Sequence, residues 1–140
     1  MARILAIDYG SKRTGIAVTD TLQIIATGLV TVHSKDVLQY IKDYIVKESV
    51  EAIVVGLPKR LNNEDTQATQ LVEAFVNTLK KQFPQMPLHR VDERFTSKMA
   101  TQAILASGVK KKDRQDKALV DMVSATIILQ SFLESRQFNR

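Results

Sequence analysis

The spacing of apolar residues in this chain changes near residue 33. Before that point, three short segments rich in Ile, Val, Ala and Thr are separated by turn-forming residues, as in a strand meander. After it, segments with apolar residues at three- and four-residue intervals alternate with short continuous apolar runs, a pattern typical of alternating helices and strands. Both patterns can be buried together in a mixed sheet with helices on both faces. We therefore expect an α/β fold with a five-stranded sheet.

The pattern also places the individual elements. Strands are expected at residues 3–7, 14–19, 23–32, 52–56 and 88–91, with a bulge at Gly28. Helices are expected from about residue 34, from about residue 63, at 96–108 and at about 116–135, with N-caps at Ser34, at Asn63 and at Thr96 or Ser97. Strands joined by helical crossovers pair in parallel, so the first, fourth and fifth strands should be parallel neighbours.

Length and composition limit the chemistry. The 140 residues fit a single domain, which we expect to span residues 1–140, and 44% of them are hydrophobic. The chain has no cysteine and only two histidines, His33 and His89, which excludes disulfides, zinc–thiolate sites and a cysteine nucleophile. A metal ion would have to be held mainly by carboxylates, and such oxygen ligands favour Mg²⁺ or Mn²⁺.

The charge balance favours a polyanionic partner. Lys and Arg number 20 against 15 Asp and Glu, giving a net charge of +5, although charge alone leaves binding to nucleic acid an open question. We find no apolar run near the ~20 residues of a membrane span and no signal-peptide pattern at the start. A cytoplasmic protein that does not associate with membranes is expected.

Two carboxylates follow predicted strands. Asp8 ends the most apolar strand, where a charge is costly to bury unless a cation or hydrogen-bond donors meet it. Glu93 follows the fifth strand, and ligands of α/β sheets bind beyond the carboxyl ends of parallel strands. Alternatively, Asp8 only forms a turn and Glu93 is a solvated loop acid. Asp92 competes with Glu93, because strand alternation lets only one of them face Asp8.

A third carboxylate lies in an apolar stripe of the last helix. Its neighbours at intervals of three and four residues are Ala118, Ala125, Ile128 and Phe132, and the carboxylate itself is Asp121. An unpaired charge there would be strongly destabilising, so Asp121 should bind a cation. The alternative is a structural ion pair with Lys or Arg from another element.

Basic residues surround these acids in the sequence. Those expected to bind the phosphates of a nucleic acid are Lys12, Arg13, Lys59, Arg94, Lys110, Lys111 and Lys112. Carboxylates that can bind divalent metal, flanked by such cations, suit phosphodiester hydrolysis. Taken alone, the run at 110–112 could equally be a solvated loop.

Four segments also match motifs of a known family, in the same order and across nearly the whole chain: residues 7–17, 55–58, 92–97 and 121–130. On these motifs the chain resembles the YqgF family, also called the RuvX or Holliday-junction-resolvase-like family, whose bacterial members are named as pre-16S rRNA nucleases. The resemblance implies a ribonuclease H-like fold, with Asp8, Glu93 and Asp121 as ligands of Mg²⁺ or Mn²⁺. Many ribonuclease H-like enzymes have four acidic ligands, and three positions match here.

The combined expectation is a metal-dependent nuclease that acts on structured RNA and matures the 5′ end of the 16S rRNA precursor. Precursor rRNA and ribosomal particles are the expected partners, and a monomer or weak dimer is the expected state. Two alternatives remain open, a Holliday-junction DNA endonuclease and a non-catalytic nucleic-acid-binding factor. A third, an actin-like ATPase suggested by the Asp8 hairpin, would need two such domains.

Overall fold

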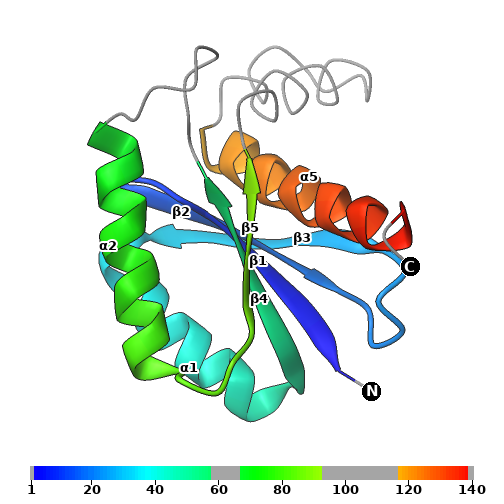
Figure 1. Ribbon diagram of the computed structural model, residues 1–140. Helices are drawn as coiled ribbons and strands as arrows, with labels where there is room; N and C mark the ends of the chain where they lie inside the picture. Colours follow the sequence, from blue (N-terminus) through cyan, green and yellow to red (C-terminus); the bar gives the residue numbers. More distant parts are fainter. Residues whose placement is uncertain (1, 58–66, 93–116, 139–140) are drawn as a thin grey trace.

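The computed structural model describes residues 2–57, 67–92 and 117–138. Figure 1 shows the arrangement of their helices and strands. In chain order the elements are β1 (Arg3–Tyr9), β2 (Arg13–Thr19), β3 (Ala26–His33), a short 3₁₀ turn η1 (Ser34–Asp36), α1 (Val37–Lys47), β4 (Val50–Leu57), α2 (Gln67–Gln82), β5 (Leu88–Asp92) and α5 (Lys117–Phe138). The helix predicted at 96–108 and the N-cap predicted at Asn63 lie outside the described residues.

The strands form one five-stranded sheet in the order β3-β2-β1-β4-β5. β2 pairs antiparallel with both β1 and β3, which is the predicted meander. β4 pairs in parallel with β1 and with β5, so the predicted parallel neighbours are confirmed. The register of β2 and β3 shifts where Ile16 pairs with Val30 and Ala17 with Gly28, which confirms a bulge beside Gly28.

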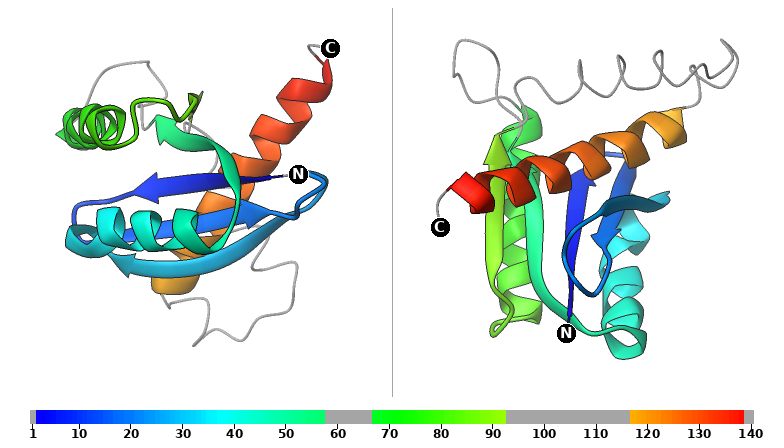
Figure 2. Two further views of the ribbon diagram at one scale, coloured as in Figure 1. Left: turned by 90° about the horizontal axis from the view of Figure 1, so that it is seen from below. Right: turned by 90° about the vertical axis from the view of Figure 1, so that its right-hand side faces the viewer.

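Helices cover both faces of the sheet because successive side chains of a strand point to opposite sides. Figure 2 shows α5 crossing one face while α1 and α2 lie against the other. The core under α1 and α2 contains Leu5, Ile7, Ile16, Val18, Val37, Ile41, Ile53, Val55, Val72, Phe75, Val76 and Leu79. The core under α5 contains Ile4, Ala6, Ala17, Ala52, Val54, Ala125, Ile128, Leu129 and Leu133.

The start of α1 differs from the prediction. Ser34 does not cap this helix: the residue before α1 is Asp36, which makes no capping hydrogen bond through its side chain. Ser34 instead begins the 3₁₀ turn, and its hydroxyl donates to the carbonyl oxygen of Gly10. The hydroxyl therefore ties α1 to the turn between β1 and β2, a tertiary contact that a local capping rule does not predict.

α5 is, by length and composition, the one helix among the described residues that could cross a membrane, over Ala118–Arg136, although we expected no such segment. In this fold it packs on the sheet and supplies four buried side chains to one core, namely Ala125, Ile128, Leu129 and Leu133. This packing accounts for the apolar side chains on the buried face of the helix.

Candidate active site

Asp8 lies near the carboxyl end of β1, on the sheet face that α5 covers. The alternation of β1 assigns this face, because Ile4 and Ala6 have the same parity as Asp8 and both belong to the core under α5. Asp8 is partly buried and pairs across the antiparallel ladder with Gly15 of β2. The carboxylate is thus held by a central strand beside a residue that has no side chain.

Gly15 lets α5 approach the sheet closely. A Cβ atom at this position would overlap the carbonyl oxygen of Asp121 and would lie 3.0 Å from the backbone nitrogen of Met122. Since Gly15 is the ladder partner of Asp8, this contact brings the first turns of α5 next to the end of β1. The start of α5 is also held by Thr31 of β3, whose hydroxyl donates to the carbonyl oxygen of Ala118 at 2.6 Å. Asp8 and Asp121, far apart in sequence, are therefore gathered on one side of the sheet.

Asp121 is paired with a cation. The Nε–H of Arg13, at the start of β2, donates to Oδ2 of Asp121 at 2.7 Å across 108 positions of the chain. The Asp121 side chain is 23% exposed and that of Arg13 is 39% exposed, so the pair lies at the edge of the core. The carboxylate is therefore not a bare charge in the apolar stripe, and its role as a metal ligand stays a prediction. The ion pair with another element, named as the alternative, is present.

The stripe itself lies slightly differently on α5 than predicted. Ala125 and Ile128 are fully buried as expected, but Ala118 is exposed and Phe132 only partly buried. Leu129 and Leu133 complete the buried face, so Asp121 lies four residues before Ala125 at the end of this face rather than in its middle.

Ser34 is a positioning residue that sequence reasoning missed. Its backbone N–H donates to the carbonyl oxygen of Lys12 at 3.0 Å, and its hydroxyl donates to that of Gly10. The Ser34 hydroxyl also lies 2.8 Å from the buried Thr14 hydroxyl. These bonds fix the turn that carries Lys12 and Arg13. The turn chemistry of residues 9–12 was visible in the sequence, but the partner that fixes it comes from beyond β3.

Asp92 lies on the opposite face from Asp8. In β5, Leu88 packs in the core under α1 and α2, and Nη1 of Arg90 donates to Oε1 of Glu73 on α2 at 2.8 Å. Asp92 has the same parity as these two residues. On the other side, the His89 ring lies 4.9 Å from that of Phe132 on α5. Of the two competing acids, Asp92 is therefore not the one that faces α5.

Several predicted site residues lie outside the described residues: Glu93, Lys59, Arg94, Lys110, Lys111 and Lys112. Lys12 is described and exposed on the turn before β2. Within the described ranges, no three carboxylate or histidine side chains come together as a metal-binding group. The described part of the candidate site consists of Asp8, Asp121, Arg13 and the exposed Lys12.

These residues fit a divalent cation in chemical type. Asp8 and Asp121 supply carboxylate oxygens, the ligands that Mg²⁺ and Mn²⁺ prefer. The position of Asp121 already attracts a positive group, since it holds the Arg13 guanidinium. The close approach allowed by Gly15 brings the backbone that carries Asp121 onto the strand beside Asp8.

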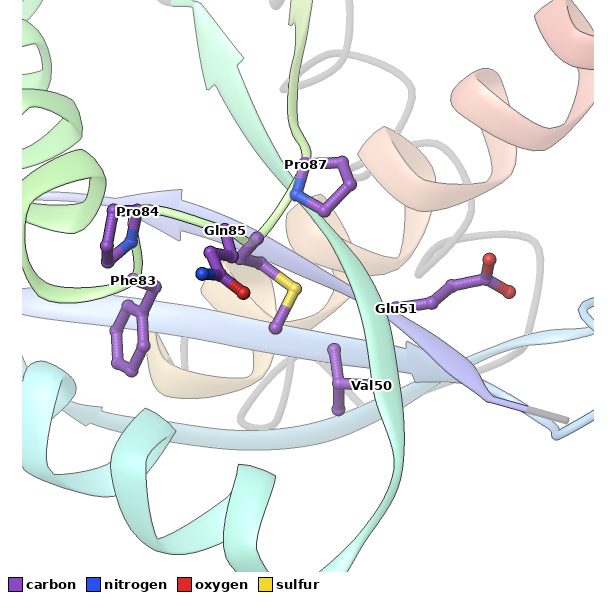
Figure 3. Close-up of a pocket in the computed structure, with 7 residues that line it drawn as sticks. Val50, Glu51, Phe83, Pro84, Gln85 and Pro87 are labelled. Carbon is purple, nitrogen blue, oxygen red and sulfur yellow. The ribbon is translucent and has the colours of Figure 1, made fainter.

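A separate pocket of about 440 Å³ lies at the amino end of β4 and is lined largely by apolar side chains, among them Phe83, Met86 and Pro87. In Figure 3 its single carboxylate, Glu51, points away from Phe83. β1 and β4 are parallel, so this pocket and Asp8 lie at opposite ends of the strands. The pocket has no part in the candidate site.

Comparison with known proteins identifies the family. A family model described as "RuvX: Holliday junction resolvase" matches residues 2–135. The chain belongs to the RuvX family. Among RuvX relatives, a protein of Bacteroides thetaiotaomicron named "Putative pre-16S rRNA nuclease" is 59% identical over 138 residues, which cover 99% of this chain and 100% of that protein. A Flavobacterium psychrophilum protein of the same name is 57% identical over 133 residues, covering 95% of this chain and 97% of that one.

Solved structures support the fold of this RuvX chain. RuvC of T. thermophilus in complex with Holliday junction substrate superposes with a TM-score of 0.57 at 16% identity, covering 98% of this chain and 96% of that one. A second structure of Thermus thermophilus RuvC gives a TM-score of 0.55 at 15% identity. The predicted ribonuclease H-like fold is confirmed, and the RuvX relatives are named as nucleases, so the family is one of enzymes that cleave phosphodiester bonds.

Proposed function

We propose that this RuvX protein is a divalent-metal-dependent nuclease that cleaves structured RNA in the 16S rRNA precursor, at its 5′ end. The observation that carries the proposal is the placement of Asp8 and Asp121 on one side of the sheet, joined through the contact of Gly15 with Asp121. The relatives named for pre-16S rRNA supply the substrate class.

Asp8, Glu93 and Asp121 are the proposed metal ligands, and Mg²⁺ or Mn²⁺ is the proposed cofactor. When bound, such ions polarise the phosphodiester and activate water for in-line attack. For Glu93 the support is indirect: the competing acid Asp92 has the parity of Leu88 and Arg90 and therefore lies on the face away from α5.

The cations have a separate role. Lys12 lies on the turn between β1 and β2 and Arg13 at the start of β2, so phosphates held by them would lie beside the acids. We propose that Lys59, Arg94, Lys110, Lys111 and Lys112 extend this contact along the RNA backbone. Contacts of this kind position a nucleic acid and carry little base specificity.

The direct test is cleavage of a precursor 16S rRNA fragment with Mg²⁺, Mn²⁺ or EDTA, alongside a DNA four-way junction. We expect cleavage of the RNA, none in EDTA, and loss of cleavage in Asp8→Asn and Glu93→Gln with unchanged melting temperatures. Asp92→Asn is the matched control, because Asp92 lies on the other face of β5. Loss of cleavage in Asp92→Asn with full activity in Glu93→Gln would reverse the assignment, and cleavage of the junction alone would favour a DNA resolvase.

The role of the basic side chains can be tested by the salt dependence of RNA binding. Contacts to single-stranded phosphates release counterions, so log K should fall with log salt by ~0.7 per contact. Changing Lys110, Lys111 and Lys112 to Ala should weaken RNA binding and flatten this slope by about one to two units. An unchanged slope would exclude these lysines as phosphate contacts and leave Lys12, Arg13 and Arg94.

Localisation and assembly remain proposals of the same kind. A nuclease that matures precursor rRNA works where ribosomes are assembled, so we propose a cytoplasmic protein that meets its substrate on ribosomal particles, as a monomer or weak dimer. Sedimentation of the purified chain with and without precursor particles would test its oligomeric state and its binding to the particles.

A further inference from the structure

The Arg13–Asp121 ion pair occupies a carboxylate that the proposed function needs for a metal ion. Nε of Arg13 lies 2.7 Å from Oδ2 of Asp121, which is a short charge-assisted hydrogen bond. The guanidinium already occupies this oxygen, and its positive charge would repel an incoming metal ion. The pair and full metal coordination at Asp121 therefore compete.

The pair is built so that only a side chain has to move. The backbone of Arg13 is paired with His33 in the β2–β3 ladder, and the adjoining turn is held by Ser34. The guanidinium, in contrast, is at the end of a long side chain that is 39% exposed. Partly exposed ion pairs are weak, so this pair can be exchanged without disturbing the fold.

We propose that Arg13 is an exchangeable counter-ion: it neutralises Asp121 in the metal-free protein and, when metal takes the carboxylate, moves to a phosphate of the RNA. The inference rests on the proposed function. Guanidinium groups bind phosphate as readily as carboxylate, so the released side chain has a partner as soon as RNA is present.

The exchange of Arg13 couples the binding of RNA to the binding of metal. An RNA phosphate that engages Arg13 removes it from Asp121 and favours metal binding, and a metal ion at Asp121 frees Arg13 for RNA. By thermodynamic linkage each ligand must raise the affinity of the other by the same factor. The ion pair thus links the affinity for metal to the presence of substrate.

The first test uses Mn²⁺ alone, with binding measured by calorimetry on the intact chain. We expect Arg13→Gln to bind Mn²⁺ about two- to fivefold more tightly than the parent, because the competing ion pair is gone. Lys12→Gln is the matched control: it removes the same charge from the same turn, and we expect a smaller change. Arg13→Met, which keeps the apolar stem, should behave like Arg13→Gln and guards against a folding defect in one variant.

The second test measures the binding of a labelled RNA oligonucleotide in EDTA and in Mn²⁺ by fluorescence anisotropy, with a gel to confirm that the RNA is intact. The affinity gain from Mn²⁺ should be smaller in Arg13→Gln than in the parent. An equal gain in RNA affinity in both proteins would contradict the exchange.

Other outcomes distinguish a failure of the Arg13 exchange from a failure of the metal site. If the parent and Arg13→Gln bind Mn²⁺ equally while Asp8→Asn does not, the exchange is wrong and the metal site stands. The exchange is also wrong if Lys12→Gln and Arg13→Gln raise the affinity equally, since net charge would then be the cause. If neither the parent nor Arg13→Gln binds Mn²⁺, the metal site of the proposed function is itself wrong.

Discussion

Gly15 of β2 lies directly against the backbone of Asp121 in α5, so closely that a Cβ atom at Gly15 would overlap the Asp121 carbonyl oxygen. The same glycine is the ladder partner of Asp8. One missing side chain thus determines how closely the helix with one candidate ligand can approach the strand with another. This relationship, more than any single bond, positions the described part of the site.

Replacing Gly15 by Ala should therefore destabilise the fold. The new methyl group meets backbone atoms of Asp121 and Met122, which can yield only if α5 moves, and overpacking of this kind costs about 1–3 kcal/mol. Chemical denaturation should show the loss. Gly28→Ala is the comparison variant, because its Cβ would meet side-chain atoms only, Cγ of Met122 at 2.7 Å and Oγ1 of Thr126 at 3.2 Å, so we expect a smaller loss. Equal losses in both variants would contradict the backbone clash.

The Ser34 hydroxyl should matter for stability as well as for the turn. Ser34→Ala removes the bond to Gly10 and leaves the buried Thr14 hydroxyl without its 2.8 Å partner, a loss of about 1–3 kcal/mol. Thr14→Val and the double variant complete a thermodynamic cycle measured by denaturant unfolding. The double variant should lose less than the sum of the singles, because the two hydroxyls share one bond. Additive losses would mean that the hydroxyls act independently.

Neutralising Asp121 should change stability only slightly. Asp121→Asn would stabilise the metal-free protein if the charge were unpaired, but the carboxylate is paired with Arg13. Partly exposed pairs contribute about 0.2–1 kcal/mol, so a small loss is now expected. Thermal melts of Asp121→Asn, Arg13→Gln and the double variant in EDTA would measure the coupling. A gain in melting temperature for Asp121→Asn would contradict the pair.

The loop between β2 and β3 should loosen in acid. Oδ1 of Asp20 accepts hydrogen bonds from the backbone N–H groups of Ile24 and Ile25, and these hold the pKa of Asp20 below its ordinary value of 3.8. A lowered pKa in the folded state means that the stabilisation is present above pH 3.8 and is lost as the pH falls through the folded value. The protection factors of the Ile24 and Ile25 amides, which are corrected for the intrinsic pH dependence of exchange, should fall over that range. In Asp20→Ala the exchange should be fast throughout, apart from its intrinsic pH dependence.

Much of the fold follows from local pattern. The apolar run before Asp8 predicts a buried strand, the alternation after residue 33 predicts parallel pairing, and both are observed. Asp8 could be singled out as a site residue because a charge at the end of such a strand is unusual. Asp121 could be singled out because helical spacing aligns it with Ala125 and Ile128, which are buried. Periodicity is a local property, so a single sequence is enough to read it.

The tertiary contacts of the site residues could not be predicted from the sequence in the same way. Nothing local joins Arg13 to Asp121, which lie 108 positions apart, or indicates that Ser34 bonds to Gly10 instead of capping a helix. The sequence by itself determined the strands, the helices and the acidic residues at their ends. The tertiary structure alone decided that Gly15 admits α5 against β2 and that Asp121 meets a cation there, because both depend on how two packed layers approach each other and not on the order of residues within either one.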